Sequence, residues 1–125
     1  MKIATHIVSA LFGLLFLAGG LFFFFGTPPP GPPEDSLPGK FMAAFGPTGY
    51  MSFVKVCEII GGLLVMVPKT RNLGLLVLGP IVLNVLCFHG FVVGGGWNPV
   101  HAFITVAPLF LLWTERNAFI KLVTR

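Results

Sequence analysis

An apolar run near the start of the chain limits the possible folds more than any other feature. Residues 3–25 are interrupted only by Thr5, His6, Ser9 and glycines. As a helix, this run of about 23 residues can cross the ~30 Å hydrocarbon core of a bilayer. A cleaved signal peptide is the alternative, but the hydrophobic region of such a peptide is usually only about 7 to 15 residues long. We therefore expect a retained membrane anchor.

The composition and three later apolar segments extend this expectation. Hydrophobic residues make up 55% of the 125 residues and charged residues only 10%, whereas soluble domains carry about 25% charged residues. The later segments are residues 51–67, 73–93 and 97–114, and the first of them is close to the minimum length for a span. This length leaves no room for a second folded module. We predict one domain over residues 1–125, an all-α integral membrane four-helix bundle.

The segment between the first two spans is rich in proline. Residues 28–33 read Pro-Pro-Pro-Gly-Pro-Pro, which cannot be helical because proline lacks the N–H donor and clashes with the preceding turn. We expect a stiff loop outside the membrane. Residues 41–50 are mildly apolar and are broken by Gly46-Pro47, so we expect a short interfacial helix or a re-entrant turn there.

The basic residues predict an orientation. If four spans alternate across the membrane, Lys40 is the only basic loop residue on one side. Six basic residues then fall on the other side: Lys2, Lys69, Arg71, Arg116, Lys121 and Arg125. Because lysine and arginine accumulate in cytoplasmic loops, we expect both termini in the cytoplasm and the proline-rich loop outside. Three spans would divide these residues between the two faces. Their scattered positions also argue against a nucleic-acid partner.

Lys55 and Glu58 are the most informative polar residues, because a charge in hydrocarbon costs at least a few kcal/mol and is usually paired or faces a polar cavity. At 100° per residue they lie about 60° apart, with Gly62 about 20° from Lys55. Gly61 and Gly62 would allow another helix to approach closely. Two interpretations remain open: an ion pair that fixes helix packing, and a role in binding a ligand or a proton.

Depth along the helices groups the polar residues in the outer half of the membrane, about 2 to 13 Å from the outer helix ends. The group comprises Lys55, Glu58, Asn84, His89 and His101. We expect a cavity open to the outside there, and nothing comparable in the inner half, where His6 would be interfacial. Asn84 and His89 lie about 140° apart, and Asn84 follows Pro80 by one turn, which favours a packing role at a kink. Two histidines and one carboxylate without fixed spacing do not predict a metal site.

The two cysteines lie on neighbouring spans. At the rise of an α-helix, Cys57 and Cys87 both lie about 9 Å from the outer helix ends. Neither has a Cys-x-x-Cys partner. We expect buried, inert thiols, with a redox pair as the alternative.

The order of these motifs resembles the DoxX and DoxX-like family of small membrane proteins. The resemblance lies in residues 41–45, in Gly49-Tyr50, in the Lys-x-x-Glu-x-x-Gly-Gly pattern within residues 54–64, and in residues 79–89, which contain Asn84 and end at His89. It implies a four-helix membrane fold. Some members of the family are subunits of quinone-reducing thiosulfate oxidoreductases or of other membrane oxidoreductase assemblies.

This resemblance, without a flavin, haem or iron–sulfur motif, implies an accessory or structural subunit without independent catalysis, associated with quinone-linked redox chemistry. Its partners would be the lipid bilayer and another protein or a second copy, in a cell membrane such as the bacterial inner membrane. One alternative is a quinone-interacting oxidoreductase in which Glu58 transfers protons and Lys55 or His89 stabilises an oxyanion. Another is a small-solute transporter or channel, which an apolar inner half disfavours.

Overall fold

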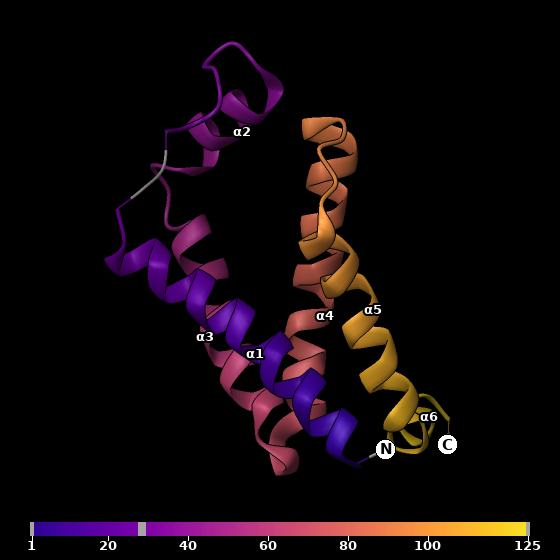
Figure 1. Ribbon diagram of the computed structural model, residues 1–125. Coiled ribbons are helices and arrows are strands. Elements are labelled where there is room, and N and C mark those ends of the chain that lie inside the picture. The colour runs from indigo at the N-terminus through magenta and orange to yellow at the C-terminus, as the bar shows by residue number, and fades with distance from the viewer. Residues whose placement is uncertain (1, 28–29, 125) are drawn as a thin grey trace.

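The computed structural model describes residues 2–27 and 30–124, and all regular elements in these ranges are helices (Figure 1). The four longest are α1 (Lys2–Phe25), α3 (Tyr50–Met66), α4 (Arg71–Cys87) and α5 (Pro99–Thr114). The bounds of α1, α3 and α5 lie within two residues of the predicted apolar segments, whereas α4 ends at Cys87 and the predicted segment continues to Val93. Shorter elements are α2 (Leu37–Phe45), the 3₁₀ turn η1 (Pro68–Thr70), the π-helical turn η2 (Phe88–Val93) and α6 (Arg116–Val123).

Two helices among the described residues are long and apolar enough to cross a membrane. One is α1, and the other is the continuous helix Pro68–Val93, which joins η1, α4 and η2. A third candidate is α2 with α3, bent by 90° at the break between them. The apolar helix α5 is shorter, with 16 residues, or about 24 Å. The chain is thus all-helical over these residues, with two to three helices that could span a bilayer.

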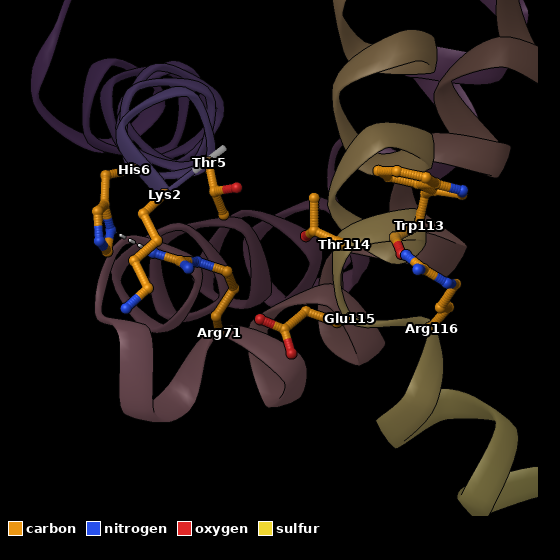
Figure 2. A pocket seen from close by; sticks show the side chains of 8 residues that line it. All are labelled: Lys2, Thr5, His6, Arg71, Trp113, Thr114, Glu115 and Arg116. Carbon is orange, nitrogen blue, oxygen red and sulfur yellow. Dashed lines mark hydrogen bonds between the residues drawn. The ribbon is translucent and has the colours of Figure 1, made fainter.

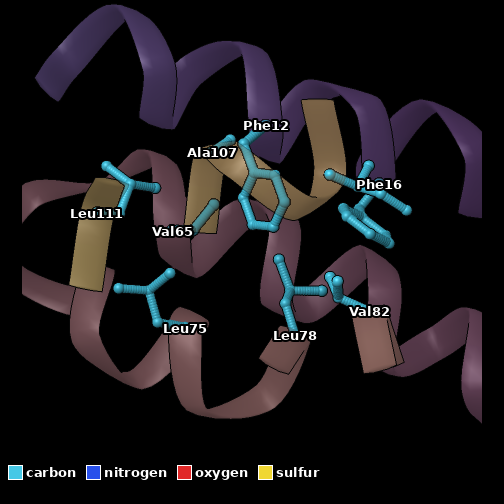
Figure 3. Packing of buried hydrophobic residues seen from close by; sticks show 9 residues of the cluster. Phe12, Phe16, Val65, Leu75, Leu78, Val82, Ala107 and Leu111 are labelled. Atoms are coloured by element: carbon cyan, nitrogen blue, oxygen red, sulfur yellow. The ribbon is translucent and has the colours of Figure 1, made fainter. Parts of the chain in front are cut away.

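Four helices contribute to one hydrophobic core. Phe12 and Phe16 of α1 point toward Leu78 and Val82 of α4, and the two phenylalanine rings pack edge to face with centroids 5.2 Å apart (Figure 3). The other buried hydrophobic residues are Val65, Leu75, Ile104, Ala107 and Leu111. The outward faces are equally apolar. Phe12 is fully buried, whereas its neighbour Leu11 is 53% exposed, as expected where lipid covers the outer face.

Glycines bring α1 and α3 into close contact. A Cβ atom on Gly62 would lie 2.6 Å from the carbonyl oxygen of Gly13, and one on Gly13 would lie 2.5 Å from the carbonyl oxygen of Gly62. Gly61 faces α4 instead, where an added Cβ would lie 2.7 Å from Leu78. Small residues permit such approaches between membrane helices. The two adjacent glycines of α3 therefore serve two different helix contacts.

The structure has two distinct ends (Figure 1). At the proline-rich end lie residues 30–36, α2, η2 and the start of α5. At the basic end lie the start of α1, η1, the end of α5 and α6. Gly94, Gly95 and Gly96 all have positive φ angles, of 83°, 143° and 73°, so they end the helix at Val93, as predicted. Pro28 and Pro29 of the expected loop lie outside the described residues.

The short helix of the expected interfacial segment begins earlier than predicted. α2 starts at Leu37 rather than Phe41 because Ser36 caps it, with the Ser36 hydroxyl accepting the N–H of Gly39 at 3.1 Å. Pro38 lies in the first helical turn. Backbone N–H groups in this turn have no acceptor within the helix, so a proline here costs no hydrogen bond. The helix then ends before Gly46 and Pro47, where the sequence predicted a break.

Candidate functional site

A cavity of about 430 Å³ lies at the proline-rich end, between α2, α3, α4 and η2. We call it the aromatic cavity, because five aromatic residues contribute to its wall: Phe41, Phe45, Tyr50, Phe88 and Phe91. Four residues of the predicted polar layer also line it: Lys55, Glu58, Asn84 and His89. A mostly apolar hollow with a few convergent polar groups is the usual form of a small-molecule site.

Lys55 and Glu58 form an ion pair on the wall of the aromatic cavity. The Nζ atom of Lys55 lies 3.2 Å from Oε2 of Glu58, and no other ion pair is found within residues 2–27 and 30–124. Their spacing of three residues places both side chains on one face of α3. Glu58 is only 6% exposed. The ammonium group also lies 5.9 Å from the ring centre of Phe23 on α1. The pair thus offers both a donor and an acceptor to a ligand inside the cavity.

Asn84 and His89 each make a local hydrogen bond. Asn84 Nδ2 donates to the carbonyl oxygen of Pro80 at 2.9 Å, the local role that its spacing from Pro80 suggested. His89 Nδ1 lies 3.1 Å from the carbonyl oxygen of Val85, and only a protonated nitrogen can donate there. In the neutral ring this leaves Nε2 as an acceptor. Although the two residues share no partner, both line the aromatic cavity, where the wider π turn of η2 begins.

His101 has a structural partner and does not line the cavity. It occupies the third position of α5 in a capping box with Asn98, whose side chain accepts from the backbone N–H groups of Val100 and His101. The Asn98 backbone N–H in turn donates to His101 Nδ1 at 3.1 Å. The imidazole packs against His89, with ring centroids 4.0 Å apart, and against Trp97 at 5.2 Å. His101 therefore contacts the cavity residue His89 without lining the cavity itself.

The described part of the chain holds no group of three or more His, Cys, Asp or Glu side chains suited to a metal ion. Both cysteines are free thiols. Cys57 is half-buried, but the expectation that Cys87 is buried was wrong, because it is exposed on the cavity rim. An apolar stretch of sequence does not bury a residue inside the protein when the helix face that carries it points outward.

The sequence prediction also missed polar residues at the basic end. Arg71, which in the sequence served only as a mark of orientation, is only 4% exposed. Its Nε donates to the carbonyl oxygen of Val65 at 3.2 Å, and its Nη2 lies 3.3 Å from Nδ1 of His6. The expectation of no comparable polar group in this half was therefore wrong. The sequence carried no signal of this burial, because the predicted span begins at residue 73 and leaves Arg71 outside it.

Family models, curated proteins and solved structures were compared with the chain, and none of them matches it.

Proposed function

We propose that this chain is a DoxX-like accessory membrane subunit whose aromatic cavity binds a lipid-soluble, ring-bearing ligand of the quinone class. The observation that carries the proposal is the convergence of Lys55, Glu58 and His89 on an otherwise apolar cavity of about 430 Å³. Ligand sites in proteins typically enclose about 300 to 1,000 Å³. The cavity is therefore large enough for one substituted ring.

The lining chemistry suits a quinone-like ring. Aromatic side chains such as Phe41, Phe45 and Phe88 offer edges and faces to a planar ligand. A carbonyl oxygen needs a donor, which the ammonium group of Lys55 supplies. A hydroxyl group of the reduced form needs an acceptor, which the Glu58 carboxylate or the free Nε2 of His89 supplies. One cavity thus offers hydrogen bonds to both redox forms.

An oxidoreductase remains the second candidate, and one observation favours it. Glu58, Lys55 and His89 line a single cavity, so a proton acceptor and a cation could act on the same ligand. Quinone-linked electron transfer in membranes that carry Glu58→Gln separates the two proposals. A loss of turnover with unchanged ligand binding indicates catalysis, whereas an accessory subunit loses binding and turnover together.

We further propose that α1, α3, the helix Pro68–Val93 and α5 each cross the bilayer, with both termini in the cytoplasm of a bacterial cell. The proposal is supported by the basic residues at the basic end, including Lys69 and Lys121, since such residues favour the cytoplasmic side. Alkaline phosphatase fused after residue 125 should be inactive, and the same enzyme inserted between residues 33 and 34 should be active. The reverse pattern contradicts this orientation.

A single-tryptophan experiment tests ligand binding directly. Trp97 lies next to the cavity residue His89, with ring centroids 6.2 Å apart, whereas Trp113 lies at the basic end. Purified Trp113→Phe protein, which keeps only Trp97, is titrated with a decyl-substituted benzoquinone, a class of compound that quenches tryptophan fluorescence. We expect saturable quenching of Trp97 and a linear, weaker response in the Trp97→Phe protein. Equal, unsaturable quenching of both proteins means that the quinone only partitions into the micelle.

Matched variants locate the bound quinone. Lys55→Met should weaken the saturable phase by about tenfold, because it removes the hydrogen-bond donor to a carbonyl oxygen of the quinone. His89→Phe, which removes an acceptor, should weaken only the competing binding of the reduced quinol. Lys40→Gln removes a charge from α2 outside the cavity and should leave the affinity unchanged. Quenching whose affinity is unchanged in Lys55→Met places the quinone elsewhere. Co-purification in mild detergent then tests the accessory role, since isolation of only a bare monomer argues against a partner subunit.

A further inference from the structure

A second hollow, of about 550 Å³, lies at the basic end between the start of α1, the start of α4 and the α5–α6 junction (Figure 2). We call it the basic hollow. It is lined by Lys2, Thr5, His6, Arg71, Trp113, Thr114, Glu115 and Arg116. It shares no residue with the aromatic cavity. Three of its residues are permanently cationic and one is acidic, so the hollow carries a net positive charge.

Arg71 is the central charge of the basic hollow, and it lies between His6 and Glu115 (Figure 2). Its side chain is held by the Val65 carbonyl oxygen and by His6. Its Nη1 atom has no partner among residues 2–27 and 30–124, and it forms no ion pair with Glu115 there. A buried guanidinium without a carboxylate partner is costly. The arrangement therefore leaves a charge and a donor available to an anion.

The surroundings of Arg71 have features that are typical of the membrane surface. Trp113 is 54% exposed beside the hollow, and tryptophan prefers the headgroup level of a bilayer. Arg116 lies over its ring at 4.5 Å and donates to the Trp113 carbonyl oxygen at 2.8 Å. Ile3, one residue after Lys2, is 76% exposed, so an apolar surface that acyl chains could cover begins directly beside the hollow.

We propose that the basic hollow binds the phosphate group of an anionic phospholipid, with Arg71 as the principal ligand and Lys2 and Arg116 at the rim. The planar guanidinium matches phosphate oxygens and remains charged at all relevant pH values. Basic pockets between membrane helices are a recognised form of lipid headgroup site. A soluble phosphate ester shares the headgroup chemistry but has no acyl chain to cover the apolar surface next to Lys2.

The test uses brominated lipids, which quench tryptophan on contact. The full chain carrying Trp97→Phe, so that only Trp113 fluoresces, is placed in phosphatidylcholine vesicles. Brominated phosphatidylglycerol or brominated phosphatidylcholine is then added over a range of mole fractions. We expect brominated phosphatidylglycerol to reach half-maximal quenching of Trp113 at a mole fraction at least about fivefold lower than brominated phosphatidylcholine does. About a fivefold difference is the effect of one well-placed cation. Equal quenching by the two lipids overturns the proposal.

Two variants distinguish a built site from diffuse attraction. Arg71→Gln should abolish the preference for phosphatidylglycerol, whereas Lys69→Gln removes the same charge from an exposed position two residues away and should retain it. Equal losses in both variants overturn the proposal in favour of general surface electrostatics. Glu115→Gln covers the case in which Arg71→Gln does not fold, because removing the competing carboxylate should strengthen the preference by about fivefold. An unchanged preference in Glu115→Gln contradicts an anion in the hollow.

A competition arm identifies the source of the phosphate group. Glycerol 3-phosphate at 10 mM, the water-soluble counterpart of the headgroup, should leave the quenching by brominated phosphatidylglycerol unchanged, with sodium sulfate at equal ionic strength as the control for screening. Displacement by glycerol phosphate and not by sulfate overturns the assignment to lipid and indicates a soluble phosphate ester.

Discussion

The contact between Gly13 and Gly62 gives the sharpest stability prediction. In Gly62→Ala the new Cβ would lie 2.6 Å from the Gly13 carbonyl oxygen and 3.0 Å from the Leu17 backbone nitrogen. Both atoms belong to the backbone, so no side-chain rotation can relieve the clash. To restore an ordinary contact distance of 3.4 Å, α1 and α3 must separate locally by roughly 0.8 Å. The substitution therefore loosens an entire helix interface.

The size of the effect follows from dispersion. A gap of 0.5 to 1 Å forfeits about a quarter to a half of the attraction between each atom pair, which is itself about 0.1 to 0.2 kcal/mol. Over roughly forty atom pairs the loss is about 1 to 4 kcal/mol, which overlaps the usual cost of overpacking, about 1 to 3 kcal/mol. Gly19→Ala on α1 is the matched control, since an added Cβ there meets nothing within 4 Å. Higher helix propensity should make that variant up to about 1 kcal/mol more stable.

Unfolding in mixed micelles measures both variants. The fraction of sodium dodecyl sulfate is raised, and helix content is followed by far-ultraviolet circular dichroism, with the variants prepared in parallel. We expect the unfolding midpoint of Gly62→Ala to fall below that of the original chain, and that of Gly19→Ala to stay level or rise. If the two alanine variants unfold together, close glycine contact does not hold α1 against α3.

Three further results are expected. Lys55→Met should lower the free energy of unfolding by about 1.5 to 3 kcal/mol, because it leaves the Glu58 carboxylate without its ion-pair partner. Replacing both Lys55 and Glu58 by Met should recover most of this loss in the same micelle assay. Asn98→Ala should cost about 1 kcal/mol by removing the cap of α5, measured by thermal unfolding. In detergent, N-ethylmaleimide should modify exposed Cys87 faster than half-buried Cys57, as peptide mass spectrometry after timed quenching would show.

The controls for these results come from the same chain. Lys40→Met removes a charge that forms no ion pair with any described residue and should leave stability unchanged. Asn117→Ala changes an exposed asparagine that caps no helix and should change the melting temperature little. An equal loss in Lys40→Met argues against the ion pair, and an equal loss in Asn117→Ala argues against the cap. Equal labelling rates for the two cysteines contradict the difference in their exposure.

The positions of the long helices could be predicted because their cause is local. Hydrophobic runs of about 17 to 23 residues identify α1, α3 and the helix Pro68–Val93 without tertiary information. The stop at Gly94 is also local, since a positive φ angle favours glycine. The short helix α2 was placed four residues too late, because the capping by Ser36 depends on one side-chain hydrogen bond that hydropathy does not register.

The site could be predicted only in part, because side-chain direction depends on neighbouring helices. The spacing of Lys55 and Glu58 placed them on one face of a helix, and their ion pair is found in the structure. Depth alone also grouped His101 with the cavity residues, although the capping box turns its ring toward Asn98. The burial of Arg71 accompanies its contacts with His6 of α1 and Val65 of α3, which no periodicity in the sequence reveals.

The short helix α2 forms a wall of the aromatic cavity but supplies none of the buried hydrophobic residues of the core. It is joined to α3 through a 90° bend. The shape of the cavity and the stability of the fold therefore depend largely on different residues. Phe41, Met42 and Phe45 lie outside the cluster of buried residues that joins α1, α3, α4 and α5. A scaffold arranged in this way can change the shape of its aromatic cavity over evolutionary time while its helix packing stays the same.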